Sequence, residues 1–434
     1  MHLKLLTALL YSVLPVALVA QSAPGDQVPL NYAQSSTPHT GRPGAAGSGG
    51  VLGNRSNGNV LGIDTVPNWS SYFYLPGVVP LGALSSTAPY YPQYTWQYTM
   101  VGHSPLLQGQ DQDWNGYSTS IGAPIIPVIV DLRNYDGSPR YLNGQRLILD
   151  PTPYIKPLLN SPLFSKSSYD SSREPTQFND AIQRAEFYNK TTADWHTLLK
   201  PRVATTRTMV LIRGTYKFAT YADGTLAYVL VDDAIFAASL FPATPTDTTT
   251  PVGAAENSGD LRTSDIGIFF FPNTYLYSDA DGSCCTLGYH TYDVEPGTKQ
   301  NGWREKHYVL AYSSWISPGI FGDSFVDITA TSHELSETFN DPFVNNATPI
   351  WVSPSTLCQN NLETGDVIEG LPNAVEPITL NGTVYHPQTE ALLQWFVSQT
   401  PSSAIHHAYS YPDTTVLTAP SVPVLPDCAT PVPF

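Results

Sequence analysis

The stretch from Thr331 to Pro342 constrains the fold of this chain most, because it joins a helical pattern to the order H-E-x-x-E. Residues four positions apart share one face of a helix, so His333 and Glu337 could hold one metal ion from the same side. Glu334, next to the first ligand, then stands where a general base for a metal-bound water is needed. The pattern predicts a metal-binding helix.

The limits of this helix follow from its flanks. Ser324 and Asp327 have the spacing of a capping box, and Pro342 disfavours the helical conformation of the residue before it. We predict a helix over about 325–340, with a buried stripe formed by Phe325, Ile328, Leu335 and Phe339.

A catalytic zinc site normally takes three protein ligands, and a second acidic cluster follows the helix. It runs from Cys358 to Asp366, and either Glu363 or Asp366 could be the third ligand. Asp341 is closer in sequence but lies at the helix end, where we expect it to cap a turn before Pro342. The alternative is a solvated helix face on which a His–Glu pair contributes little. Only 13% of the residues are charged, so two acids beside a histidine stand out and favour the site.

Carboxylates are harder ligands than those zinc usually meets. We therefore predict zinc, with calcium and manganese as open alternatives. Among other histidines, His290 is expected to be structural, as a lone loop histidine usually is, with a role as an extra ligand or a transition-state donor as the alternative. His406 and His407 are expected to form a surface pair, because adjacent side chains point apart. The sequence contains no G-x-S-x-G nucleophile motif and no phosphate-binding glycine loop.

The N-terminus has the layout of a secretory signal peptide over residues 1–20: His2 and Lys4 precede an apolar run. A single membrane anchor is the alternative, but the run is short for a spanning helix. We predict a secreted or periplasmic protein with no membrane span after cleavage. Residues 21–60 are rich in Gly, Ser and Pro and are expected to form a flexible leader. Residues 61–434 are predicted to form a single α+β domain, with the metal site within 265–430.

The net charge is −16, which would repel a polyanion, so nucleic acid is excluded as a partner. An exported chain with four cysteines is expected to form disulfides. Cys284 and Cys285 are adjacent and would be strained if bonded to each other, so we expect each to pair with a distant partner. No C-x-x-C spacing supports a cysteine zinc site.

Apolar and β-branched runs predict strands, and apolar positions at helical spacing predict helices. Strands are expected over 94–101, 123–132, 208–212, 227–231, 266–271 and 307–313, and helices over 153–159 and from about 176 to 187. Pro242 to Asn257 is predicted as a loop. The fold class is therefore α+β, with a mixed or antiparallel sheet packed against a zincin-like helix that carries HExxE.

Several of these motifs together resemble the phosphate-induced protein 1 (EXORDIUM-like) family and related secreted bacterial proteins with the pattern H-E-x-x-E-x-x-[TN]-[DN]-P, then Trp, then E-[IGA]-x-D-x-C. The matching residues are His333, Glu334, Glu337, Asn340, Asp341, Pro342, Trp351, Glu363 and Asp366. The run from Gly382 to Phe396 and the tripeptide Gly288-Tyr289-His290 are also similar. The likeness covers about residues 265–430, and Ile368 stands where the family has a cysteine. It implies secretion and the site pattern; the plant members are extracellular growth-related proteins without an established reaction.

From these patterns we expect a secreted, metal-dependent, peptidase-like hydrolase. Its ligands would be His333 and Glu337 with Glu363 or Asp366, its base would be Glu334, and its substrate a peptide or an extracellular or cell-wall polymer. The alternative is a non-catalytic extracellular or cell-wall binding protein of the EXORDIUM-like kind, with a structural metal or none.

Overall fold

The computed structural model describes residues 26–35, 60–61, 73–75, 94–96, 100–102, 118–169, 174–187, 195–278, 284–299, 303–322, 325–352, 358–397, 400–401 and 405–421. The predicted signal peptide, most of the predicted leader, Ser324 and Cys428 lie outside these residues.

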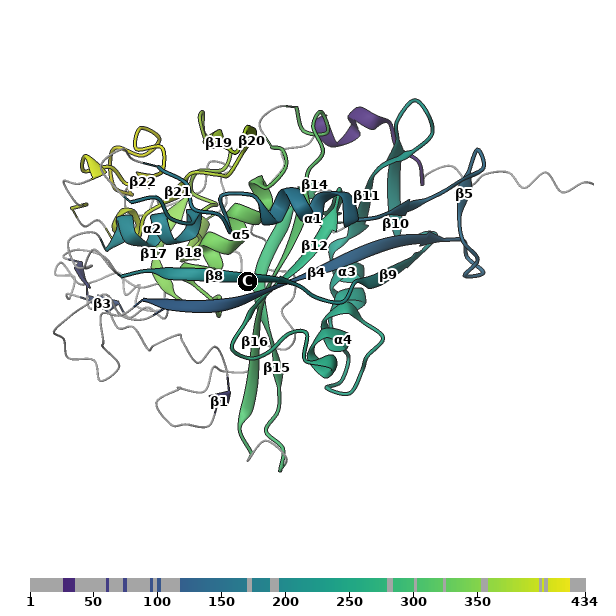
Figure 1. The fold of residues 1–434 in the computed structure, drawn as a ribbon, viewed down its shortest axis with the longest axis horizontal. Helices are drawn as coiled ribbons and strands as arrows, with labels where there is room; N and C mark the ends of the chain where they lie inside the picture. Colours follow the sequence, from purple (N-terminus) through teal and green to yellow (C-terminus); the bar gives the residue numbers. More distant parts are fainter. Residues whose placement is uncertain are drawn as a thin grey trace, which may run out of the picture.

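A mixed sheet of eight described strands forms the centre of the molecule (Figure 1). Its path runs β1-β16-β12-β4-β7; β15 pairs with β16, and β8 and β9 pair with β4. The pairs of β16 with β1 and β12, and of β4 with β12, β8 and β9, are parallel, whereas β15–β16 and β4–β7 are antiparallel. The strands are β1 (Val60–Leu61), β4 (Thr119–Arg133), β7 (Ile148–Leu149), β8 (Thr197–Val203), β9 (Arg207–Ile212), β12 (Ile266–Pro272), β15 (Gly288–Glu295) and β16 (Glu305–Trp315).

Smaller sheets surround this centre. A four-stranded sheet in the order β10-β11-β13-β14 contains β10 (Tyr216–Thr220), β11 (Leu226–Asp232), β13 (Thr274–Tyr277) and β14 (Cys284–Thr286). The two-stranded pairs are β2 (Phe73–Leu75) with β3 (Tyr94–Trp96), β5 (Tyr141–Leu142) with β6 (Gln145–Arg146), β17 (Ala347–Val352) with β18 (Cys358–Asn361), β19 (Ile378–Leu380) with β20 (Thr383–Tyr385), and β21 (Glu390–Ala391) with β22 (Ser410–Tyr411).

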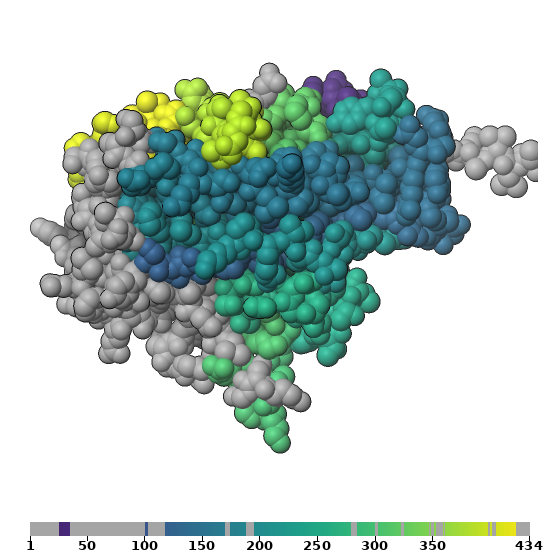
Figure 2. Space-filling view, viewed as in Figure 1, coloured from purple at the N-terminus to yellow at the C-terminus, as the bar shows by residue number. Residues whose placement is uncertain are grey.

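Helices cover both faces of the central sheet. In the view of Figure 1, α1, α2 and α5 lie above it, and α3 and α4 lie below. The helices are α1 (Thr152–Leu159), α2 (Phe178–Glu186), α3 (Asp233–Leu240), α4 (Pro251–Ser258), α5 (Thr329–Asn340) and α6 (Leu393–Phe396), with a 3-10 helix at Leu30–Ser35. Figure 2 shows the blue segment with α1 and α2 across the middle of the molecule.

The alternation of apolar side chains along the strands explains the two layers. Ile268 and Phe270 of β12 pack in the cluster that includes α2 and α5, whereas Phe269 and Phe271 pack in the cluster with α3 and α4. Successive side chains of a strand point to opposite faces, so a continuous apolar run needs a cover on each side. The core around the central sheet therefore consists of two apolar layers, one on each face.

The prediction of an α+β chain with a mixed sheet is confirmed. The run 123–132 lies inside β4, and the runs 208–212, 227–231, 266–271 and 307–313 lie inside β9, β11, β12 and β16. The helix predicted over 153–159 is α1, and the one predicted from about 176 is α2, which begins at Phe178. The predicted loop 242–257 is partly wrong, because α4 begins at Pro251 with the Thr250 hydroxyl as its N-cap.

The helix of the motif is shorter than predicted. It begins at Thr329, and no side-chain hydrogen bond caps it. Asp327 has φ +46°, outside the helical region, and its carboxylate accepts hydrogen bonds from the Ile328 amide (2.5 Å) and the His386 amide (3.0 Å). The predicted capping box is therefore wrong, because Asp327 binds the His386 segment and lies before the helix. The C-terminal limit at Asn340 is confirmed.

The disulfide prediction is also wrong for the adjacent cysteines. Cys284 and Cys285, at the start of β14, are bonded to each other. Because these two cysteines are bonded to each other, neither has a thiol left for a distant partner.

Part of the predicted flexible leader is ordered. Residues 26–35 lie along the four-stranded sheet: the Val28 amide donates to the Phe218 carbonyl (2.8 Å), and the Tyr228 hydroxyl accepts from the Ala33 amide (3.3 Å). No helix among the described residues is both long and apolar enough to cross a lipid bilayer.

Candidate metal centre

Helix α5 is polar in sequence but buried along its whole length. It packs on β15, β16 and α2, where Asn179 donates a hydrogen bond to the Ser336 hydroxyl (2.8 Å). The hydroxyls of Ser332, Ser336 and Thr338 donate to carbonyls of the preceding turn at 2.8, 2.9 and 2.7 Å. Because these side chains satisfy themselves within the helix, burial costs them little. A polar helix can therefore carry ligand side chains into the interior.

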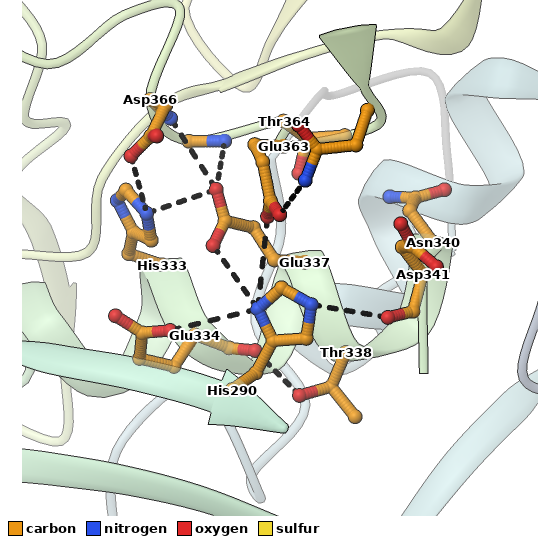
Figure 3. Close-up of polar contacts among 12 residues, drawn as sticks. His290, His333, Glu334, Glu337, Thr338, Asn340, Asp341, Glu363, Thr364 and Asp366 are labelled. Carbon is orange, nitrogen blue, oxygen red and sulfur yellow. Dashed lines mark hydrogen bonds and ion pairs between the residues drawn. The ribbon is translucent and has the colours of Figure 1, made fainter. Parts of the chain in front are cut away.

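The first group of candidate ligands surrounds the His333 imidazole. His333 Nε2 lies 3.0 Å from Glu337 Oε1, one helical turn away, and 3.5 Å from Asp366 Oδ1 (Figure 3). These three residues are buried, and their ligand atoms lie within 4.8 Å of one another. The structure thus brings Asp366, and not Glu363, next to His333.

The second group surrounds His290, which lies on β15. Its Nδ1 faces three carboxylates: Glu337 Oε2 at 3.3 Å, Glu363 Oε2 at 3.7 Å and Glu334 Oε2 at 3.8 Å (Figure 3). His290, Glu334 and Glu337 also have ligand atoms within 4.8 Å of one another. The prediction of His290 as a lone loop histidine is corrected: it lies in a strand, among the predicted site residues.

The loop after β18 carries Glu363 and Asp366. In each carboxylate one oxygen accepts a hydrogen bond and the other has no hydrogen-bond partner. The Asn361 amide donates to Glu363 Oε1, and the Gln359 amide donates to Asp366 Oδ2 (2.5 Å). The backbone amide of Gly365 donates to Glu337 Oε1 (3.1 Å). These bonds fix the orientation of each carboxylate and leave the other oxygen directed at the histidines.

Five buried carboxylate oxygens of the cluster have no hydrogen-bond partner: Glu334 Oε1 and Oε2, Glu337 Oε2, Glu363 Oε2 and Asp366 Oδ1. A buried carboxylate oxygen without a partner costs free energy unless a proton or a cation satisfies it. Four of these atoms lie 3.3–3.8 Å from a nitrogen of His290 or His333. Such an arrangement can hold a cation.

The spacing of the atoms fits metal coordination. Ligand atoms bonded to one tetrahedral zinc ion at about 2.0–2.1 Å lie about 3.4 Å apart. The contacts of His333 with Glu337 and Asp366 (3.0 and 3.5 Å) bracket that value, and so do the contacts of His290 with Glu337 and Glu363 (3.3 and 3.7 Å). Buried His, Glu and Asp groups of this chain can therefore hold a metal ion.

The electrostatics agree with this reading. Burial raises the pKa of Glu334 to about 7 and that of Asp366 to about 6. Burial, and then the charge of Glu337, hold the pKa of Glu363 well above its usual range. Positive charge is therefore strongly favoured in this cluster.

The pKa values of the two histidines are also raised, whereas that of Glu337 is lowered. Burial lowers the pKa of His290, but the nearby carboxylates, Glu363 first, hold it well above its usual value. His333 is affected in the same way, with Glu337 as its main partner. Burial opposes ionisation of Glu337, yet His333 and His290 hold its pKa below its usual range. Glu337 is thus the carboxylate that stays ionised between the two imidazoles.

A second layer of polar groups supports the ligand loop. The side-chain amide of Gln388 donates to the Gly365 carbonyl (2.8 Å), and the backbone amide of Gln388 donates to the Ser332 hydroxyl (2.8 Å). The Thr364 hydroxyl donates to Glu390 Oε2 (3.2 Å). Hydrogen bonds of this kind orient metal ligands and tune their affinity. Gln388 and Glu390 were not among the predicted site residues, although both lie inside the run 382–396.

The other residues singled out in the sequence lie outside the two groups of candidate ligands. The Asp341 carboxylate accepts from the amides of Asn345 (2.8 Å) and Asn346 (3.1 Å), so it caps the turn after Pro342 and not a turn before it. Trp351 donates to the Asn361 carbonyl (2.9 Å) and packs edge-on against Trp395, which holds the strand before Glu363. His406 and His407 are exposed, as predicted.

No protein-family model, no curated protein and no solved structure matches this chain in comparisons with known proteins.

Proposed function

We propose that this chain is a metal-dependent hydrolase with peptidase-like chemistry. His333, Glu337 and Asp366 would hold the ion, and Glu334 would act as the general base. The observation that carries the proposal is the convergence of four unpartnered, buried carboxylate oxygens on two histidines.

The ligand set suggests the metal. One imidazole nitrogen and two carboxylate oxygens at near-tetrahedral spacing suit zinc. The oxygen-rich surroundings suit manganese as well, and calcium through carboxylates alone. We propose zinc first, in a zincin-like arrangement where α5 supplies two ligands and the base.

The proposed mechanism assigns each residue one task. A divalent cation in this centre would act as a Lewis acid toward a scissile carbonyl and lower the pKa of water. Glu334, with both oxygens unpartnered, would accept a proton from the attacking water and return it to the leaving amine. A pKa of about 7, raised by burial, suits a group that both accepts and donates a proton near neutral pH. Asp366 and Glu337 would bind the ion as negatively charged ligands.

A second candidate function belongs to another class. Every candidate ligand is buried, and the side chains of His333, Glu334 and Glu337 have 0% exposure. Closed coordination is typical of structural metal sites. An extracellular or cell-wall binding protein, in which the same residues hold a structural metal, is therefore the alternative. Both candidates would act outside the cytoplasm, in keeping with the predicted signal peptide; the hydrolase would act on a peptide or a cell-wall polymer.

The experiment that tests the proposal compares wild type with Glu334→Gln. The purified mature proteins are assayed for bound metal and for hydrolysis of a mixed peptide library and of cell-wall fragments. We expect Glu334→Gln to keep metal at His333 and to lose about 10²–10⁴-fold in rate, the usual contribution of general acid–base catalysis. Glu256→Gln is the matched control, because Glu256 is also a buried carboxylate with both oxygens unpartnered, on α4.

Two results would refute parts of this proposal. Metal bound by both proteins with hydrolysis by neither would leave the structural role. No bound metal, together with a His333→Ala variant as stable as wild type, would remove the metal centre itself.

A further inference from the structure

We infer that this centre holds two divalent cations, with Glu337 as the bridging carboxylate and His290 as the nitrogen ligand of the second ion. The inference rests on the proposed metal centre and extends it. The second ion would be held by His290 Nδ1, Glu337 Oε2 and Glu334 Oε2.

The orientation of the His290 ring suits a metal ligand. His290 Nε2 lies 3.0 Å from the carbonyl oxygen of Asp341. A carbonyl oxygen only accepts hydrogen bonds, so Nε2 carries the proton, and in the neutral ring Nδ1 then presents a lone pair. A histidine that ligates a metal almost always donates its other N–H to a carboxylate or backbone carbonyl in this way. The ring is thus held in the tautomer that a metal ligand needs.

The lone pair of His290 Nδ1 faces three carboxylate oxygens. Three carboxylate oxygens lie 3.3–3.8 Å from Nδ1, and all three are buried without a hydrogen-bond partner. A lone pair opposite three carboxylate oxygens is repulsive unless a proton or a metal ion lies between them. A cation at this place satisfies the nitrogen and the oxygens of Glu334 and Glu337 at once.

Glu337 lies between the two histidines, where its carboxylate can bridge two ions. Its Oε1 lies 3.0 Å from His333 Nε2, and its Oε2 lies 3.3 Å from His290 Nδ1. The two ligand groups share Glu337 and no other residue. A carboxylate that offers one oxygen to each of two ions holds them about 3.5–4 Å apart, the separation found in two-metal hydrolytic sites.

The buried negative charge of the cluster also favours two ions. Glu334, Glu337, Glu363 and Asp366 bring four carboxyl groups into the interior, and Glu390 lies behind them. When both histidines ligate as neutral imidazoles, one divalent cation would leave part of this buried charge uncompensated, whereas two would match four carboxylates. In this arrangement Glu334 ligates through Oε2 and keeps Oε1 free to accept a proton.

The experiment counts ions without reference to activity. The metal-free protein is titrated with Mn²⁺ or with Zn²⁺, and bound ions per chain are measured by native mass spectrometry and elemental analysis. We expect two ions in wild type and one each in His290→Gln and His333→Gln. His307→Gln is the matched control: His307 is a buried histidine of β16 with a carboxylate partner, Glu305, and this variant should keep two ions.

Electron paramagnetic resonance of the Mn²⁺-loaded protein gives a second readout. Two bridged ions give a spin-coupled spectrum, and His290→Gln should convert it to that of an isolated ion. If His290→Gln does not fold, the wild-type spectrum decides the question: a coupled spectrum supports the inference, and an isolated one overturns it.

The outcomes separate this inference from the proposed function. Two ions without any hydrolysis would support the two-ion centre and refute the enzyme. One ion in wild type, whether or not His290→Gln retains it, would overturn the second site and leave the hydrolase proposal standing. No bound ion would overturn both.

Discussion

The backbone of Gly365 lies directly against the imidazole of His333. A Cβ atom at Gly365 would come within 2.4 Å of His333 Nδ1 and Cε1, far inside van der Waals contact. Only glycine lets the ligand loop approach the histidine this closely, so its backbone amide reaches Glu337 Oε1.

We therefore expect Gly365→Ala to displace His333 or the loop and to weaken metal binding by about 10–100-fold, the range found when a support of a metal ligand is lost. Isothermal titration with Zn²⁺ measures the change. Gly267→Ala is the control, because its Cβ would meet the Leu261 side chain at 2.9 Å and no candidate ligand. Equal affinities of Gly365→Ala and wild type would contradict the proposed role of His333.

Removal of metal should lower the stability of the fold. An ion bound only by the folded state stabilises it by about 3–4 kcal/mol at concentrations of 100–1,000 times the Kd. We expect a chelator to lower the Tm of wild type by more than that of His333→Ala, since that variant has already lost a ligand. A chelator effect of the same size in both proteins would place the stabilising ion elsewhere.

Metal affinity should fall as the pH falls. The pKa of Asp366 is raised to about 6 and that of Glu334 to about 7, both by burial, and a protonated carboxyl does not ligate. The carboxylate forms needed for binding are therefore lost as the pH decreases through these values. Kd measured at several values between about pH 5 and 8 should decrease steadily with rising pH. A constant Kd over this range would show that the shifted carboxyls are not ligands.

Glu186 should make the fold less stable at alkaline pH. It is buried on α2, accepts the Leu393 amide (3.0 Å), and has its pKa raised by burial from 4.5 to about 8. A raised carboxyl pKa means that the folded state holds its proton longer than the unfolded state. Its contribution is fully present below about pH 4.5 and is lost as the pH rises through 8, at up to about 1.4 kcal/mol per pH unit.

The Glu186→Gln variant removes this dependence, because an amide does not ionise and its oxygen can still accept the Leu393 amide. Urea unfolding at about pH 5 and pH 8 should show a smaller loss of stability in Glu186→Gln than in wild type. Glu174→Gln, at an exposed position, controls for the lost charge. Identical slopes in wild type and Glu186→Gln would mean that Glu186 ionises normally.

Local patterns were enough to predict the helix of the motif and most of the sheet. The apolar runs in β4, β9, β11, β12 and β16 need two covered faces wherever they lie, so their strands could be identified without tertiary information. The pair His333 and Glu337 followed from helical geometry alone. Both kinds of inference depend on near neighbours in the chain.

Predictions that depended on distant contacts were less successful. The sequence left Glu363 and Asp366 as equal candidates, and only the fold places Asp366 beside His333 and Glu363 beside His290. The start of α5 was misplaced because Asp327 binds His386, 59 residues further along the chain. His290 was undervalued because its strand pairing with β16, which brings it to α5, is not visible in the local sequence.

The second layer behind the ligand loop has a kinetic consequence. Gly365 is held by Gln388, and the Thr364 carbonyl accepts the Ala391 amide (2.9 Å), so the loop cannot move without breaking contacts to the segment 388–391. Since every candidate ligand is buried, a bound ion would leave only when these contacts open together. Its residence time would then be set by the opening rate of the loop and not by the strength of the metal–ligand bonds, so the protein would retain its metal even where free metal is scarce.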